Sequence, residues 1–310
     1  MSSVAANGIR IEYEEFGDPC DPAVVLVMGY SAQMVVWPEA FCRALAEQSL
    51  RVIRFDNRDV GLSTHLDGVK APGMLRCMFG PRLGLRLSVP YSLDDMALDT
   101  LGLMDALHID RAHIVGASMG GMIAQIIAAK HPDRAASLTS IMSTSGNRKL
   151  PGPRPKVLRH AVFKNRKNFT REQTIEYLIE FFQMNASPAY PVTLEERRER
   201  ITAWLNRSFD PAGTARQFAA MATTPDRTAL LATIEVPVLV IHGEEDPLIP
   251  AECGRHTAQC IKNADLHVFP GMGHDLPEQL IPQLTGLIAS HCAASDVAGN
   301  SGTADLAETA

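Results

Sequence analysis

The chain has 310 residues, of which 46% are hydrophobic and 21% are charged, and its formal net charge is −6. This composition predicts a globular protein with one large core and room for an inserted subdomain, and its acidity argues against a nucleic-acid partner. No apolar run reaches membrane-spanning length and the N-terminus shows no secretory signal pattern, so we expect a cytoplasmic protein without membrane contact.

Strand and helix patterns alternate through the first half of the chain. Asn7 and Gly8 form a type I′ hairpin signal between a short strand and an alternating strand at 9–16. The apolar strands that follow are interleaved with helical patterns, which is typical of a mostly parallel sheet with helices on both faces. The expected strands are 23–28, 51–55, 112–116 and 137–144, and the expected helices are 34–47, 93–107 and 119–130.

The alternation stops after residue 144 and resumes near residue 236. We interpret the stretch between them as a helical cap inserted after the sixth strand, with helical patterns at 171–185, 194–209 and 212–222. Such a cap would exclude water from the cleft and limit the size of the substrate. The predicted organisation is a core made of 1–144 and 234–292, a helical cap of 145–233 and a disordered tail of 293–310.

The tail is expected to be disordered because its Ala-, Ser- and Gly-rich composition cannot offset the entropy of ordering. The cap, in contrast, is rich in aromatic residues, which suggest an apolar pocket for the acyl or alkyl group of a small-molecule substrate. The alternative is that most of these side chains simply pack in the core of the helices. The residues are Phe163, Phe169, Phe181, Phe182, Trp204 and Phe218.

Ser118 lies where a predicted strand turns directly into a helix, between Gly116 and Gly120. A serine on so tight a bend has a strained backbone, and the residues two before and two after it have no room for side chains. The helix that starts at Met119 directs backbone N–H groups and the positive end of its dipole at the space beside the serine oxygen. The motif predicts a nucleophilic serine; a Gly-rich turn at an ordinary helix start is the alternative.

A serine nucleophile needs a base, and the base needs a carboxylate to orient it. Asp246 follows the predicted strand at 236–243 and His274 follows the last strand, which gives the order serine, acid, histidine. Asp246 is our candidate acid and Glu245 the reserve; Glu244 is also open, because a shift of one residue at a strand end changes which side chain faces the cleft. Alternatively, Asp246 and His274 each cap a helix.

The negative charge that develops during acyl transfer needs backbone N–H donors. The strand at 23–28 ends at Gly29 and leads into a helical pattern, so the N–H of Tyr30 can pair with that of Met119. We expect these two N–H groups to form the oxyanion hole. An ordinary strand-to-helix turn is the alternative for the segment around Tyr30.

Metal-site spacing is absent from the sequence. The other histidines form no pair of the zinc-binding type, and the six cysteines are scattered without a C-x-x-C pair. We therefore expect reduced thiols, no bound metal and no cofactor.

From about Gly8 to His291 the chain resembles the α/β-hydrolase family, and within it the serine carboxylesterases similar to aclacinomycin methylesterase. The resemblance implies the α/β-hydrolase fold and a histidine that braces the oxyanion loop at the position where this chain has Met28. Haloalkane dehalogenases and epoxide hydrolases of this fold carry aspartate at the position of Ser118, so the serine argues against both activities. The segments that carry the resemblance are 26–29, 54–63, 115–121, 242–246 and 271–274.

We expect a serine hydrolase that cleaves a carboxylic ester through an acyl-enzyme, with Ser118, His274 and Asp246 as its triad. Its activity should rise with pH as the histidine base loses its proton. The same triad serves lactonases, carbon–carbon bond hydrolases, peptidases, acyltransferases and cofactor-free perhydrolases, and the family includes small-ligand receptors with little turnover. The sequence leaves these alternatives open.

Overall fold

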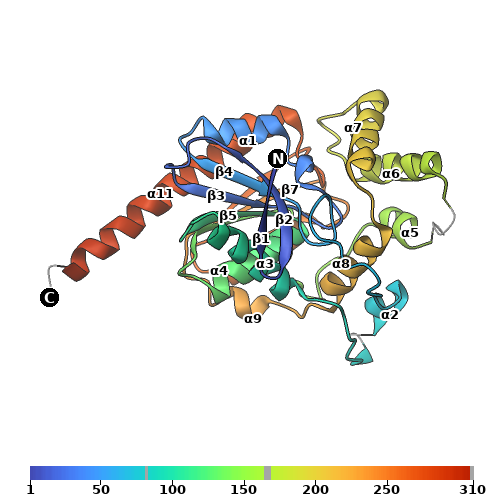
Figure 1. The fold of residues 1–310 in the computed structure, drawn as a ribbon, viewed down its shortest axis with the longest axis horizontal. Coiled ribbons are helices and arrows are strands. Elements are labelled where there is room, and N and C mark those ends of the chain that lie inside the picture. Colours follow the sequence, from blue (N-terminus) through green and yellow to red (C-terminus); the bar gives the residue numbers. More distant parts are fainter. Residues whose placement is uncertain (81–82, 164–168, 308–310) are drawn as a thin grey trace.

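A computed structural model describes the backbone of residues 1–80, 83–163 and 169–307, and the side chains of these ranges except 162–163 and 298–307. An eight-stranded sheet in the order β1-β2-β4-β3-β5-β6-β7-β8 forms its centre (Figure 1). β2 runs antiparallel to both β1 and β4, and the pairs from β4 to β8 are parallel. The strands are β1 Ser2–Ala6, β2 Ile9–Phe16, β3 Ala23–Val27, β4 Arg51–Phe55, β5 Ala112–Ala117, β6 Ala135–Ile141, β7 Val238–Gly243 and β8 Asp265–Phe269. The expected mostly parallel sheet is confirmed.

Hydrophobic clusters lie on both faces of this sheet. Every residue of β3 is buried, and alternate side chains enter different clusters because successive residues of a strand point to opposite faces. Val25 and Val27 pack with α3 (Leu93–Ala106) and α4 (Met119–Lys130). Val24 and Leu26 pack with α1 (Glu39–Ala46) and α11 (Ile281–Ala307). The unbroken apolar run at 23–27 is therefore explained by burial of β3 on both faces of the sheet.

The expected helical region lies between β6 and β7, with α5, α6 and α7 on one side of the sheet (Figure 1). α6 and α7 pack on each other through a small cluster of their own, which includes Ile179 and Ile201. Capping boxes begin both helices, with Thr170 before α6 and Thr193 before α7. The helices of this region, which we call the cap, are α5 Pro155–Phe163, α6 Arg171–Asn185, α7 Leu194–Arg207, α8 Pro211–Thr223 and α9 Thr228–Leu231.

Smaller elements complete the fold outside the cap. α2 (Met74–Phe79) lies in the Gly- and Pro-rich stretch that precedes α3, and α10 (Ala251–Cys260) connects β7 to β8. A short 3-10 helix, Glu278–Leu280, leads into α11.

The single helix expected at 34–47 is wrong. The chain forms a 3-10 turn, Met34–Val36, and then α1 from Glu39 to Ala46. Pro38 separates the two, because proline has no N–H to donate and keeps the preceding residue out of the helical region. Proline at the start of α1 is well placed, since the first N–H groups of a helix need no partner within it.

α11 runs from Ile281 to Ala307 and so includes the start of the tail at 293–310, whose expected disorder stays a prediction. Ser295 is buried, and Asp296 lies 3.3 Å from the imidazole of His113. The run from Gly299 to Thr303 consists of residues with low helix propensity, so the helix there extends from the part of α11 that packs on the core. Residues 308–310 lie outside the described part of the chain. Within the described residues, no helix is both long and apolar enough to span a membrane.

Candidate active site

Ser118 occupies a sharp turn between β5 and α4. Its φ of 56° and ψ of −118° place it in a strained region that costs a non-glycine residue about 1–3 kcal/mol. Neighbouring glycines allow the turn: a Cβ on Gly116 would lie 2.2 Å from the carbonyl oxygen of Gly120, and a Cβ on Gly120 would lie 2.0 Å from that of Val27. The turn leaves Ser118 half-buried at the start of α4.

The side chains of Ser118, His274 and Asp246 form one hydrogen-bonded series. His274 Nε2 lies 3.0 Å from Ser118 Oγ, and His274 Nδ1 lies 2.6 Å from Asp246 Oδ2. They meet because each follows one of the strands β5, β7 and β8, which are parallel and so end at one edge of the sheet. When Asp246 is ionised, Nδ1–H donates to the carboxylate, and Nε2 is free to accept the serine proton.

Asp246 is buried and has several hydrogen-bond donors. Its Oδ1 accepts from the backbone N–H groups of Leu248 and Ile249, each at 2.9 Å. Burial by itself raises the pKa of the Asp246 carboxyl, but the charge of His274 and the hydrogen bonds from His242 and His274 outweigh burial and lower the pKa below its ordinary value. The surroundings therefore hold this group as a carboxylate.

The two neighbouring acids have other positions. Glu244 is exposed, and Glu245 accepts a hydrogen bond of 2.5 Å from the backbone N–H of Gly271. Of the three candidate acids, the structure brings Asp246 to the imidazole of His274. Glu245 instead holds the start of the loop that carries His274.

His242 lies behind the acid, and sequence reasoning assigned it no part in the site. Its Nε2 is 2.7 Å from the carbonyl oxygen of Ile249 and 3.5 Å from Asp246 Oδ2, and its side chain is fully buried. Since the carbonyl oxygen can only accept, Nε2 carries a proton and donates it. His242 lies in the same segment, 242–246, as Asp246, which indicated that the two residues are close. The orientation of the His242 side chain, however, depends on how the loop at 244–250 folds back.

The loop that carries Tyr30 packs against the serine. A Cβ on Gly29 would lie 3.1 Å from Ser118 Cβ, and Asn57 Nδ2 donates to the carbonyl oxygen of Met28 at 2.9 Å. Met119 is the first residue of α4, whose first N–H groups have no partner within the helix. Tyr30 and Met119 thus belong to the two segments that flank Ser118, as predicted, and their role as oxyanion donors stays a prediction.

A segment of the cap contacts the loop of His274. The backbone N–H of His274 donates to the carbonyl oxygen of Asn185 at 2.7 Å, and that of Gly273 donates to Ser187 Oγ at 2.8 Å. Burial raises the pKa of Asp275, although Ser187 donates hydrogen bonds to its carboxyl group through both N–H and O–H. No sequence pattern indicated these contacts, because Ser187 and Asp275 are 88 residues apart in the chain.

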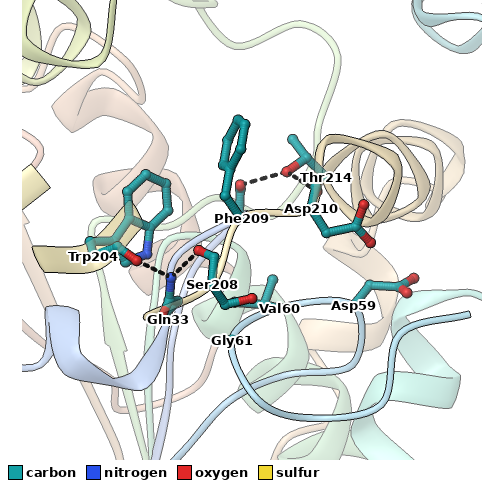
Figure 2. Close-up of a pocket in the computed structure, with 10 residues that line it drawn as sticks. Gln33, Asp59, Val60, Gly61, Trp204, Ser208, Phe209, Asp210 and Thr214 are labelled. Atoms are coloured by element: carbon teal, nitrogen blue, oxygen red, sulfur yellow. Dashed lines mark hydrogen bonds between the residues drawn. The ribbon is translucent and has the colours of Figure 1, made fainter. Parts of the chain in front are cut away.

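A polar cluster at the junction of core and cap has possible metal ligands in Asp59, His65 and Asp210, whose ligand atoms lie within 4.8 Å of one another. Arg216, however, donates to Asp59 at 2.7 and 2.8 Å and to Asp210 at 3.2 Å. Asp59 and Asp210 line a cavity of about 10 Å³, which has room for about one water molecule; Figure 2 shows its lining residues. The cluster fits an ion-paired anchor between core and cap better than a metal site.

Comparisons with known proteins agree with this architecture. A family model described as alpha/beta hydrolase fold matches residues 22–279. Rhodomycin D methylesterase of a Streptomyces species is 29% identical over 95% of this chain and 98% of its own length. A bifunctional esterase/perhydrolase of Acinetobacter calcoaceticus is 26% identical over 87% of this chain and 91% of its own. A solved meta-cleavage product hydrolase from Pseudomonas fluorescens shares the fold, with a TM-score of 0.75, 21% identity, and coverage of 95% of this chain and 98% of that chain.

Proposed function

The chain belongs to the α/β-hydrolase fold family, and within it we propose that the protein is a serine carboxylesterase that cleaves a small, apolar carboxylic ester. The observation that carries this proposal is the hydrogen-bonded series from Ser118 Oγ through His274 to Asp246. The two relatives described as esterases, one of them a methylesterase, support ester hydrolysis over other uses of the fold. Methyl esters of apolar acids are therefore the first substrates to examine.

In the proposed reaction His274 Nε2 takes the proton of Ser118 as Oγ attacks the ester carbonyl carbon. Asp246 orients the imidazole and stabilises the imidazolium that forms. The backbone N–H groups of Tyr30 and Met119 donate to the carbonyl oxygen as it becomes negative. When the carbon–oxygen bond to the alcohol breaks, His274 returns the proton to the leaving alkoxide, and Ser118 remains acylated.

Deacylation repeats these steps with water as the nucleophile. His274 accepts a proton from the water while the hydroxide oxygen attacks the acyl carbon, and it then protonates Ser118 as the acyl-oxygen bond breaks. The carboxylic acid leaves, and the triad returns to its starting protonation state. Every proton in this cycle passes through His274 Nε2, which is why the 3.0 Å contact to Ser118 Oγ matters.

The test is turnover of a panel of short p-nitrophenyl and methyl esters by the wild-type protein and by Ser118→Ala. We expect wild-type hydrolysis, labelling of Ser118 by a fluorophosphonate, and loss of at least about 10³-fold in kcat in the variant. Ser3→Ala, which changes an exposed serine of β1, is the matched control and should keep full activity. Full turnover by pure, folded Ser118→Ala would refute the proposal, and labelling without turnover of any ester would favour a receptor.

A further inference from the structure

We propose that Gln217 of α8 is a positioning residue that holds the oxyanion loop, defined as residues 28–31, in its working geometry. The inference rests on the proposed function, because it assigns a task to a cap residue during stabilisation of the oxyanion. The cap would then contribute to the chemical step as well as covering the site.

Both ends of the Gln217 amide are used, and both bonds reach core loops. Gln217 Oε1 accepts from the backbone N–H of Ser31 at 2.7 Å, and Gln217 Nε2 donates to the carbonyl oxygen of Arg58 at 2.9 Å. The side chain is fully buried. A buried amide with both groups bonded has one favourable orientation, since any rotation would leave a polar atom unpaired. Gln217 therefore fixes the peptide between Tyr30 and Ser31.

This peptide follows directly on the predicted oxyanion donor. The Ser31 N–H is held by Gln217, and the carbonyl oxygen of Met28 is held by Asn57. The Tyr30 N–H therefore lies in a short segment that is anchored on both sides, which limits where it can point. Stabilisation of an oxyanion is sensitive to such changes, because the donor must lie near the position that the oxygen takes in the transition state.

The backbone of Ser31 is strained, which shows that outside contacts determine its conformation. Its φ is 58°, a left-handed value that is uncommon for a residue other than glycine. A second contact from α8 supports it, because Ser31 Oγ lies 2.8 Å from Thr214 Oγ1. Thr214 donates its own hydroxyl hydrogen to the carbonyl oxygen of Asp210 at 3.0 Å, so Ser31 is the donor to Thr214.

α8 is itself held firmly against the core. Arg216, next to Gln217, donates two hydrogen bonds to Asp59, and both side chains are buried. Gly213 lies so close to the core that a Cβ there would be 2.3 Å from the carbonyl oxygen of Asp59. The ring of Phe218 meets that of Tyr30 edge to face at 6.2 Å. Consequently α8 can act as a fixed support for the loop.

The support from Gln217 also explains how the oxyanion loop can carry Met28. The family resemblance implies a bracing histidine at this position, whereas a thioether is only a weak hydrogen-bond acceptor. In this chain Asn57 holds the carbonyl oxygen of Met28 from one end of the loop, and Gln217 holds the N–H of Ser31 from the other. We infer that these two amides replace the bracing that Met28 cannot supply.

The test compares Gln217→Met with Gln33→Met. Gln33 is an equally buried glutamine that also joins core to cap, but its Nε2 donates to the carbonyl oxygens of Trp204 and Ser208 (Figure 2). We expect Gln217→Met to lower kcat by about 10- to 100-fold, part of the loss seen when an oxyanion donor is removed, with KM changed by less than about three-fold. Gln33→Met should lose stability and keep kcat within about two-fold.

A second readout separates positioning from a structural effect. A trifluoromethyl ketone that forms a tetrahedral adduct should bind Gln217→Met more weakly by about the same factor as kcat/KM falls, whereas a ground-state competitive inhibitor should bind unchanged. Thr214→Val should show the same pattern of inhibitor binding with a smaller fall in kcat/KM. It replaces Gln217→Met in the test if that variant does not fold. Equal kcat in Gln217→Met and wild type, or equal losses in Gln217→Met and Gln33→Met, would overturn the inference. Activity of Ser118→Ala would instead refute the proposed function, so the two failures are distinguishable.

Discussion

Ser187 of the cap donates its hydroxyl hydrogen to Asp275, the residue that follows His274. The same Ser187 oxygen accepts the backbone N–H of Gly273 at 2.8 Å, so one side chain holds both neighbours of the proposed base. The carbonyl oxygen of Asn185 completes the set by accepting the N–H of His274 itself. The loop of His274 is therefore fixed by the segment that leaves α6.

Ser187→Ala should lower kcat by roughly ten-fold, since the hydrogen bonds lost are together worth about 1–3 kcal/mol and they position the imidazole. KM should change less. Steady-state kinetics on the best ester measures both parameters. Ser295→Ala, a buried serine of α11 that bonds only to the carbonyl oxygen of His291 among the hydrogen bonds described, is the matched control and should keep the wild-type kcat.

Asp246→Asn should lower kcat by about 10³- to 10⁴-fold while leaving the fold intact, because an amide favours the wrong imidazole tautomer and cannot stabilise the imidazolium. The adjacent Glu244→Gln is a suitable control, since Glu244 is exposed and should tolerate the change. Comparable activity of Asp246→Asn and wild type would exclude Asp246 as the orienting acid. In that event Glu245→Gln, whose carboxylate now holds Gly271, becomes the variant to measure.

The acylation rate should fall as the pH is lowered from neutral to mildly acid values. The pKa of Asp246 lies below its ordinary value, so this carboxylate stays charged in that range and the fall reports protonation of the base. Stopped-flow acylation, with chemistry limiting, measures the effect. A flat rate would contradict His274 as the base.

The lowered pKa of Asp246 also has a consequence for stability. A carboxyl group with a lowered pKa in the folded state stabilises that state above its unfolded pKa of about 3.9, and this contribution is lost as the pH falls toward the folded value. Denaturant unfolding at a series of acid pH values should show a smaller loss of stability in Asp246→Asn than in the wild type.

Gly120→Ala should destabilise the protein severely, because the added Cβ would lie 2.0 Å from the carbonyl oxygen of Val27. Gly286→Ala in α11 should do the opposite and stabilise by about 0.5–1 kcal/mol, since no atom lies within 4 Å of its added Cβ and alanine is the better helix former. Chemical denaturation measures both. A neutral Gly120→Ala would show that the serine turn has more room than the structure gives it.

The sequence predicted the sheet well where apolar runs are long and bounded by turn residues. The strand 51–55 and the helix 171–185 have the expected bounds, because Val52, Ile53 and Phe55 favour a strand in the first and a capping threonine precedes the second. The helix expected at 34–47 was wrong because its apolar pattern continues across Pro38. For the tail, composition alone did not reveal that α11 begins before residue 293 and continues into it.

The three proposed triad residues could be found from the sequence because each follows a strand, and parallel strands place their carboxyl ends together. The residues that support the triad could not be found from the sequence. Ser31 and Gln217 are 186 positions apart, and their contact depends on how α8 packs on the core. Local patterns of charge and hydrophobicity carry no information on such a pairing.

The contacts of Ser187 and Gln217 divide the cap into two parts with different freedom to change. α8 and the segment at 185–189 contact the loops that carry Tyr30 and His274, so substitutions there are expected to lower the rate of the proposed reaction. α6 and α7 pack on a small core of their own, so their outward-facing residues can vary with little effect on those groups. New substrate preferences are thus most accessible, for natural variation or for engineering, through this outer part.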